Sequence, residues 1–141
     1  MIRAATPADQ RAVKALLAFA GLPEAGLEST RLWVLDDGGV VGAVGLKVHG
    51  RSALLRSLVV VPSRRGRGEG RLLLNHAIAE ARRAGCTQVG ALTTTIAPWL
   101  ARLGWRPTPT KDLPRELYAS AELKGACRDT AAAFLLPLAP L

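Results

Sequence analysis

The stretch Leu58–Leu74, LVVVPSRRGRGEGRLLL, decides the fold that the sequence predicts. Its first four residues favour a strand, and Pro62 ends that strand because proline cannot donate to a sheet ladder. A run rich in glycine and arginine follows, and a helical pattern begins at Arg71. Glycines let consecutive N–H groups point at one spot, and a helix N-terminus adds its positive end. We therefore expect this loop to bind a phosphorylated ligand.

Two common phosphate-binding motifs do not fit this loop. The P-loop needs a lysine at the start of the helix, and no lysine lies between Lys47 and Lys111. The dinucleotide fingerprint needs a third glycine where this chain has Arg71, and an acidic strand end about twenty residues later is missing. The pattern that fits is Arg-x-x-Gly-x-Gly at Arg65, Gly68 and Gly70.

That pattern, with Val-x-Pro before it and Leu-Leu after it, resembles the acetyl-CoA motif of the GNAT superfamily of N-acetyltransferases. The resemblance implies acetyl-CoA as co-substrate, no metal, and a pantetheine arm paired with the strand before the loop. It also implies that Thr93 takes the place of an asparagine common in the family. The residues assigned in this way to acetyl-CoA binding are Leu58, Val59, Val60, Arg65, Gly66, Arg67, Gly68, Glu69, Gly70, Arg71 and Thr93.

Length and composition indicate one globular domain over residues 1–141. The chain has 49% hydrophobic and 21% charged residues, which is a balance typical of a folded protein. It has no apolar run of membrane-spanning length and no basic start followed by an apolar stretch, so we expect a cytoplasmic protein without membrane contact. Two cysteines, Cys86 and Cys127, do not make a disulfide framework, and we expect reduced thiols.

The net charge of +8 attracts anions, and nucleic acid is the usual partner of such a chain. Aromatic residues make up only 4%, and no basic stripe is interleaved with stacking aromatics. The densest basic cluster is Arg64, Arg65, Arg67 and Arg71, inside the glycine loop itself. The sequence therefore favours a phosphate role for this cluster and predicts no nucleic-acid partner.

The expected elements follow the GNAT order of strand, one or two helices, three strands, helix, strand, helix and strands. This order predicts an α/β (α+β) GNAT fold with helices on both faces of a mixed, mostly antiparallel sheet, splayed between strands 4 and 5. The expected strands are 1–5, 31–35, 40–48, 53–61, 88–95 and 130–138. The expected helices follow Thr6 up to Gly21, follow Arg71 up to Gly85, and cover 24–27, 98–103 and 113–123.

Two side-chain arrangements are also predicted. Strict alternation along strand 53–61 would place Leu54, Arg56, Leu58 and Val60 on one face and the intervening residues on the other. An arginine in so apolar a strand needs a partner, which is either an internal carboxylate or a substrate in an aqueous pocket. On the long helix, we expect His76 and Glu80 to form a solvent-facing pair opposite the apolar side.

The resemblance implies direct attack of an amine on the thioester, with an N–H near Val59 or Val60 stabilising the oxygen. Many relatives carry a glutamate on the motif strand and a tyrosine before a Gly-aromatic pair. This chain has 54–57, LLRS, on that strand and Leu100 at the tyrosine position, so the general base and acid are unassigned. Tyr118 is a possible substitute acid, although a packed tyrosine is the simpler interpretation.

Short stretches at 21–27, 54–60, 92–95 and 102–105 are similar to small acetyltransferases of arsenic-resistance operons. That likeness implies that Arg56 and Ser57 line the acceptor site, and an arginine there suits an acceptor with a carboxylate, such as an amino acid analogue. The segment 22–28 is a candidate lid over this site. Cys127 suggests thiol–arsenic chemistry, yet a single thiol is usually a small apolar residue.

The function that these observations favour is acetyl transfer from acetyl-CoA to the primary amine of a small molecule. Within the same fold, the acceptor could instead be a protein N-terminus or a lysine side chain. Outside enzymes, the chain could be a degenerate acyl-CoA-binding regulator or a basic RNA-associated domain. A homodimer is possible because dimers are common among GNAT proteins.

Overall fold

The computed structural model describes residues 1–119 and 131–139, and Cys127 lies outside them. The strands are β1 Ile2–Ala4, β2 Arg31–Asp36, β3 Val40–His49, β4 Ser52–Val60, β5 Gln88–Thr93, β6 Arg106–Thr108 and β7 Ala132–Pro137. The α-helices are α1 Gln10–Ala20, α2 Glu69–Arg83 and α3 Ala97–Arg102. Short 3₁₀ turns are η1 Pro7–Asp9, η2 Leu27–Ser29, η3 Pro62–Arg64, η4 Thr110–Asp112 and η5 Arg115–Ala119.

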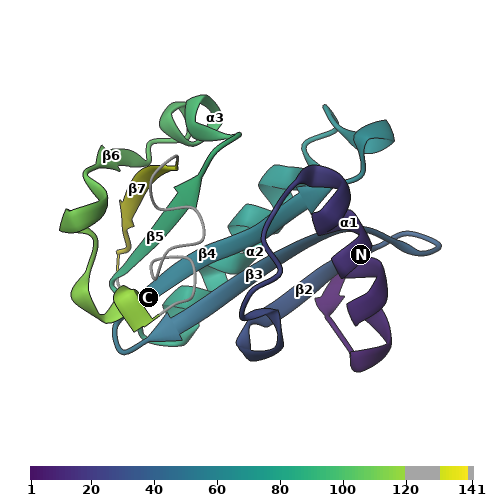
Figure 1. Ribbon diagram of the computed structural model, residues 1–141, viewed down its shortest axis with the longest axis horizontal. Helices are drawn as coiled ribbons and strands as arrows, with labels where there is room; N and C mark the ends of the chain where they lie inside the picture. Colours follow the sequence, from purple (N-terminus) through teal and green to yellow (C-terminus); the bar gives the residue numbers. More distant parts are fainter. Residues whose placement is uncertain (120–130, 140–141) are drawn as a thin grey trace.

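The strands form one seven-stranded sheet in the order β1-β2-β3-β4-β5-β7-β6. All neighbours are antiparallel except β4 and β5, which run parallel. Their pairing covers only 52–55 of β4 and 88–91 of β5, after which the two strands part (Figure 1). The predicted mixed sheet and its splay are confirmed. The sheet ends at β1 and β6, each three residues long.

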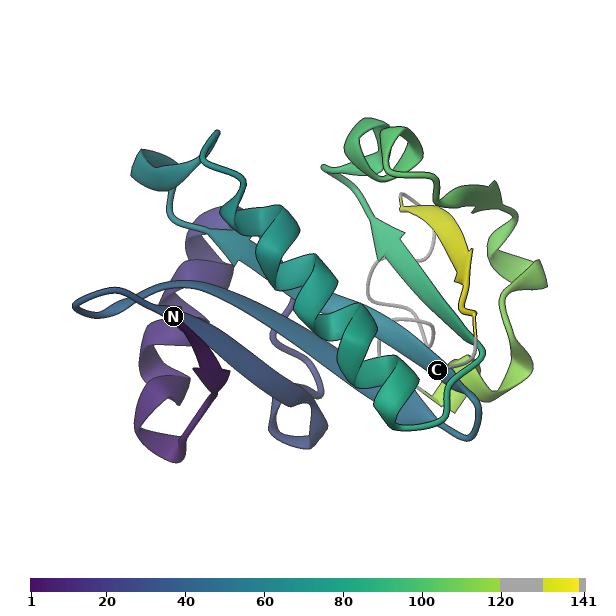
Figure 2. The same cartoon turned by 180° about the vertical axis from the view of Figure 1, so that it is seen from behind.

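Helices cover both faces of the sheet, as predicted. Helix α2 crosses one face diagonally (Figure 2), and it buries Leu73, Leu74, Ala77 and Ala81 against β3, β4 and β5. Helix α1 lies on the other face and buries Val13 and Leu17. The four-residue spacing of these side chains explains why α1 is helical, and Gly21 ends it at φ +70°, a conformation that glycine adopts without strain.

Strand β4 departs from the predicted alternation because it bulges at Ser57. Arg56 pairs with Gly45 and Val59 with Ala43, so two residues of β4 oppose one of β3. Ser57 takes φ +59°, which is unusual for a residue other than glycine. Because of the extra residue, each side chain after the bulge points to the opposite face of the sheet from the one that strict alternation predicts. Leu54 and Arg56 therefore do not share a face with Leu58 and Val60, and the prediction that they do is wrong.

The predicted pair of His76 and Glu80 is also wrong. The His76 ring packs edge-on against Trp33 of β2, with ring centroids 5.3 Å apart, and Glu80 instead accepts a hydrogen bond from Arg83 Nε at 3.0 Å. His76 Nε2 is buried and has no hydrogen-bond partner among the described residues. Helix α2 lies close enough to β2 for this contact, which sequence spacing within one helix cannot indicate.

Several element boundaries differ from the sequence predictions. Helix α2 begins at Glu69, two residues earlier than expected. The turn expected at 24–27 lies at Leu27–Ser29, and the helix expected at 113–123 is, in its described part, the 3₁₀ turn Arg115–Ala119. No helix in the part of the chain that the structure describes is long and apolar enough to cross a membrane.

Arg3 joins the first strand to both the first helical turn and the β2–β3 hairpin. Its guanidinium contacts Asp9 at 2.8 Å and Asp36 at 3.0 Å, which holds the pKa of both carboxyls below their usual range. Asp36 also accepts a hydrogen bond from the N–H of Gly39 at 3.1 Å. Turn geometry therefore accounts for this aspartate. Cys86 is a free thiol, and burial raises its pKa.

We expect Leu73→Ala to lower the free energy of unfolding by about 2–5 kcal/mol, because its fully buried side chain joins α2 to the sheet. The neighbouring Leu72 is 56% exposed, and Leu72→Ala should change stability by no more than about 0.5 kcal/mol. Urea unfolding followed by circular dichroism measures both. Equal losses in the two variants would contradict the packing of α2 described above.

Candidate functional site

A cavity of about 740 Å³ opens where β4 and β5 part and extends to the glycine loop. Its walls include Leu58, Val59 and Val60 of β4. On the side away from β3, these residues have no strand neighbour among the described residues. Backbone N–H and C=O groups of a strand that lacks a partner are available to an extended ligand. The cavity therefore offers an edge along which a flexible chain can lie.

The far end of the cavity is the loop between β4 and α2. Gly66 and Gly68 take φ +83° and +78°, and open space surrounds the position of a Cβ at both, so backbone conformation is what requires glycine there. Gly68 is the N-cap of α2, and the first bond of the helix runs from the Leu72 N–H to the Gly68 carbonyl at 3.1 Å. The N–H groups at the start of α2 thus have no acceptor within the helix. Such N–H groups are donors that a bound anion could use.

The four arginines of the loop have different environments. Arg64 is engaged by protein carboxylates: its Nε and Nη2 donate to Glu69 at 3.0 and 2.6 Å, and its Nη1 donates to Asp37 at 2.7 Å. Arg65 Nε donates to the Val60 carbonyl at 3.3 Å, and Arg65 and Arg71 both line the cavity. Arg67 is exposed and lines neither this cavity nor the one beside Arg56. The four arginines therefore do not act as one cluster: one is paired with carboxylates, two line the cavity, and one lies outside it.

The contact between Arg64 and Glu69 compensates the negative charge at the start of α2. Glu69 occupies the first position of α2, and the Arg64 guanidinium holds the pKa of its carboxyl below the usual value. Asp37, from the β2–β3 hairpin, binds the same guanidinium. The loop is thereby fixed to the hairpin. The side chain of Glu69 serves this fixation, and the residue also lines the larger cavity.

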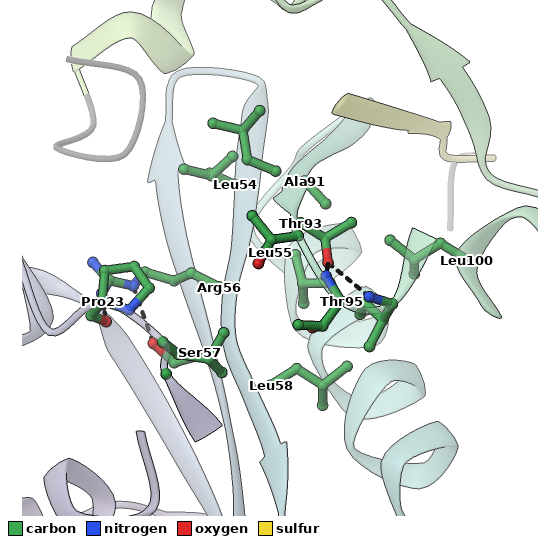
Figure 3. A pocket seen from close by; sticks show the side chains of 15 residues that line it. Pro23, Leu54, Leu55, Arg56, Ser57, Leu58, Ala91, Thr93, Thr95 and Leu100 are labelled. Carbon is green, nitrogen blue, oxygen red and sulfur yellow. Dashed lines mark hydrogen bonds between the residues drawn. The ribbon is translucent and has the colours of Figure 1, made fainter. Parts of the chain in front are cut away.

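A second, smaller cavity of about 80 Å³ adjoins the first and shares Leu22, Leu58, Thr95 and Ile96 with it. Arg56, Ser57 and Pro23 lie on one side of it, and Thr93 and Leu100 lie on the other (Figure 3). The two predicted acceptor-site residues therefore lie next to the predicted cofactor cavity. Of the residues assigned to the cofactor, Thr93 lines only this smaller cavity.

Arg56 is 7% exposed and holds the segment that follows α1. Its Nη2 donates to the Pro23 carbonyl at 3.1 Å, its Nη1 donates to the Ala25 carbonyl, and its Nε donates to Ser57 Oγ at 3.1 Å. The sequence left open whether this arginine meets a carboxylate or a pocket. The structure places it in the pocket wall while its guanidinium fixes the segment predicted as a lid.

Acid–base groups are scarce at the two cavities. Among the residues that line them in the described chain, Glu69 carries the only carboxylate, and it is paired with Arg64. Leu100 is fully buried at the position where relatives carry a tyrosine. The Tyr118 hydroxyl donates to the Thr110 carbonyl at 3.0 Å and lines neither cavity, so it is a packed tyrosine. The described residues also contain no cluster of metal-binding side chains.

Sequence reasoning missed two aromatic side chains that line the larger cavity. Phe19 is 77% exposed on α1, out of phase with the buried residues of that helix, and Trp99 lies on α3. The sequence offered one signal for Phe19, namely that this aromatic residue lies outside the apolar stripe of its helix. Trp99 lies within the helix that the sequence predicts at 98–103. Only the position of α3 beside the loop shows that it also faces the cavity.

We expect Arg64→Gln to raise the pKa of Glu69 toward its ordinary value of about 4.3, because the neighbouring positive charge is lost. Because the pKa of Glu69 is lowered in the wild type, the contact contributes its full stabilisation at pH values above that ordinary pKa. The contribution is lost as pH falls through the lowered pKa. Carbon-detected NMR titration measures the change. Arg65→Gln is the control, since Arg65 contacts a carbonyl instead, and a similar shift there would contradict the pairing.

Comparison with known proteins agrees with this geometry. The sequence profile of the Acetyltransferase (GNAT) domain matches residues 28–107. A search of curated proteins found no match. N-acetylglutamate synthase from Neisseria gonorrhoeae, solved with coenzyme A and N-acetyl-glutamate, is similar at 25% identity and TM-score 0.81. The match covers 99% of this chain but only 35% of the synthase, so the chain spans about a third of that protein.

Two further solved structures match over nearly their whole length. Rv2747 from Mycobacterium tuberculosis, in complex with CoA and NLQ, has 21% identity, TM-score 0.82 and 99% coverage of both chains. The putative acetyltransferase yncA from Salmonella typhimurium, with acetyl-CoA, has 20% identity, TM-score 0.68, and coverage of 100% of this chain and 95% of that one. These two likenesses show the fold. With the profile match over more than half of its length, the chain belongs to the GNAT acetyltransferase family.

Proposed function

We propose that this protein transfers the acetyl group of acetyl-CoA to the primary amine of a small molecule, and that the acceptor is an amino acid or an analogue. The observation that carries the proposal is the junction of the two cavities. One combines a free strand edge with a phosphate loop, and the other ends at Arg56. The two share Leu58, so a thioester lying along β4 would meet an acceptor amine there.

The residues at the larger cavity suit acetyl-CoA. The N–H groups at the start of α2 would donate hydrogen bonds to the pyrophosphate, with Arg65 and Arg71 adding positive charge beside it. The edge of β4 at 58–60 would pair with the amide groups of the pantetheine arm, and Trp99 and Phe19 supply apolar cover. The family and its CoA-bound neighbours support this assignment. When bound, acetyl-CoA supplies the activated acetyl group.

The chain's own contribution to the reaction is positioning and backbone polarity. The neutral acceptor nitrogen forms a bond to the acetyl carbon, the carbon–sulfur bond breaks, and CoA leaves as the thiolate, which takes up, through water, the proton that the nitrogen then loses. A backbone N–H at Val59 or Val60 would stabilise the negative charge that grows on the carbonyl oxygen. An amine with a pKa near about 10 must first lose a proton. Because the only carboxylate at the cavities is paired, we propose that this proton leaves to water.

The neighbours support an acceptor of amino-acid type. The synthase structure holds N-acetyl-glutamate, and the Rv2747 structure holds NLQ beside CoA. The short stretches similar to acetyltransferases of arsenic-resistance operons also favour a small acceptor. The volume of the smaller cavity, about 80 Å³, agrees with a small molecule better than with a protein lysine or N-terminus.

One observation favours a second candidate function. Leu100 is fully buried where a tyrosine would protonate the leaving thiolate, and the paired Glu69 cannot act as a base without losing Arg64. A protein with this site could bind acyl-CoA and regulate a partner without turnover. A panel of free amines with acetyl-CoA, followed by thiol release, separates the two functions. Turnover of an amine supports the enzyme, and tight CoA binding without turnover of any amine supports the regulator.

We expect Arg65→Ala and Arg71→Ala each to weaken CoA binding about tenfold, since each removes a charged group from the phosphate end of the cavity. The difference from wild type should shrink as salt rises, because exposed charges are screened. Calorimetry with CoA measures both effects. Arg106→Ala is the matched control, as Arg106 is an exposed arginine on β6 that lines neither cavity. Unchanged affinity in both loop variants would disprove the phosphate assignment.

A further inference from the structure

The smaller cavity is lined from both faces of the sheet at the point where β4 and β5 part. Leu55 and Ala91 are the last pair of the parallel ladder, and both belong to the core beneath α2, as does Leu100 of α3. Leu54 belongs to a core on the opposite face, and Arg56 binds carbonyls of the segment after α1 on that same face. Figure 3 shows the arginine on one side of β4 and Leu100 on the other. The cavity therefore has two different halves.

The half beneath α2 has apolar walls. Leu55, Ala91 and Leu100 are buried there, and Leu58 and Ile96 border the opening that this cavity shares with the larger one. Among the described residues that line the smaller cavity, the only charged side chain is the arginine of the other half. Apolar walls favour an apolar occupant, because water in such a space lacks hydrogen-bond partners.

Two hydroxyl oxygens at this cavity are engaged by donors of the protein itself. Thr93 Oγ1 accepts hydrogen bonds from the N–H groups of Thr95 at 3.2 Å and Ile96 at 3.0 Å, so it caps the turn that leads into α3. Ser57 Oγ accepts from Arg56 Nε at 3.1 Å, on the side away from Leu100. These bonds within the protein leave the walls of the half beneath α2 apolar.

The apolar half lies where the acyl group of a bound thioester would point. The two cavities meet at Leu58 and Ile96, which is the proposed position of the thioester. The acceptor amine is proposed to enter from the half beside Arg56, so the other half is available to the acyl group. The whole cavity measures about 80 Å³, several times the space that one water molecule requires. A methyl group is about as large as a water molecule, so an acetyl group leaves part of this space empty.

We infer that the half beneath α2 is an acyl-chain pocket, so that the enzyme transfers propionyl and butyryl groups from the corresponding acyl-CoA at least as well as acetyl groups. This inference rests on the proposed function and extends it to the acyl donor. The chemistry is unchanged: the amine nitrogen bonds to the acyl carbon, the carbon–sulfur bond breaks, and the thiolate takes up through water the proton that the nitrogen loses. Leu100, which is fully buried, closes the pocket and limits the chain length.

The first test measures binding and needs no acceptor. Calorimetry compares CoA with acetyl-, propionyl-, butyryl- and octanoyl-CoA on the wild-type protein. We expect the affinity to rise about fourfold for each methylene added between acetyl and butyryl, because each one leaves water for an apolar wall. Octanoyl-CoA should bind no more tightly than butyryl-CoA, since its chain exceeds the pocket.

Two substitutions change the pocket in opposite directions. Ala91→Val should fill it and reduce the preference for butyryl-CoA over acetyl-CoA to about onefold, and Leu100→Ala should enlarge it and let octanoyl-CoA bind more tightly than butyryl-CoA. Each affinity is expressed relative to CoA on the same variant, which cancels a general loss of folded protein. Ala101→Val and Leu103→Ala are the matched controls, because neither residue lines a cavity, and both should keep the wild-type preference.

The second test follows turnover with one free amine that the wild type acetylates. The kcat/KM for propionyl-CoA and butyryl-CoA should equal or exceed that for acetyl-CoA, and Ala91→Val should lower both while it leaves the value for acetyl-CoA within about twofold. A wild type that binds acetyl-CoA more tightly than propionyl-CoA, or whose affinity still rises up to octanoyl-CoA, would overturn the pocket. An unchanged chain-length preference in both pocket variants would overturn its position.

The failure of this inference can be told apart from the failure of the proposed function. CoA binding and amine acetylation without any dependence on chain length would overturn the acyl-chain pocket alone. Absence of CoA binding to the wild type would overturn the proposed function, and the pocket with it. If Ala91→Val does not fold, the wild-type acyl-CoA series and Leu100→Ala still decide, since they require no added side-chain volume.

Discussion

The separation of β4 from β5 is the constraint on which the rest of this structure depends. The two strands pair in parallel as far as Leu55 and then diverge, and the bulge at Ser57 lies just beyond that point. Divergence frees the outer edge of β4 for a ligand and at the same time directs the strand toward the loop that begins α2. The divergence of β4 from β5 therefore produces the groove in which a flexible chain can lie, and it leads to the N–H groups at the start of α2.

The charged residues around this groove occupy distinct positions. Arg64 is neutralised by Glu69 and Asp37 and serves to hold the loop against the β2–β3 hairpin. Arg65 and Arg71 stay at the cavity wall. The arginines of the loop therefore differ in role: one is paired with carboxylates, and two line the cavity.

Sequence alone was sufficient for the order of elements, the strand-loop-helix motif and the splay, because each depends on local signals. Pro62, the glycines after it and the spacing of Leu73, Leu74 and Ala77 act within a few residues of one another. The two-residue period of a strand failed at Ser57, since a bulge depends on the partner strand and reverses every face beyond it.

The sequence also could not predict contacts between segments that lie far apart in the chain. Nothing in the sequence near His76 indicates its contact with Trp33. Likewise, Arg64 could not be told apart from Arg65 in the motif, because the aspartate that engages it comes from a hairpin far earlier in the chain.

The two outer strands of the sheet have a consequence for how this protein behaves at high concentration. β1 and β6 are both very short, and Pro107 in the middle of β6 cannot donate a backbone hydrogen bond. Short edges that contain proline are poor templates for another chain, so growth of the sheet from molecule to molecule is disfavoured. The open interior edge of β4 lies inside the groove instead, with Trp99 of α3 and the glycine loop as neighbouring walls.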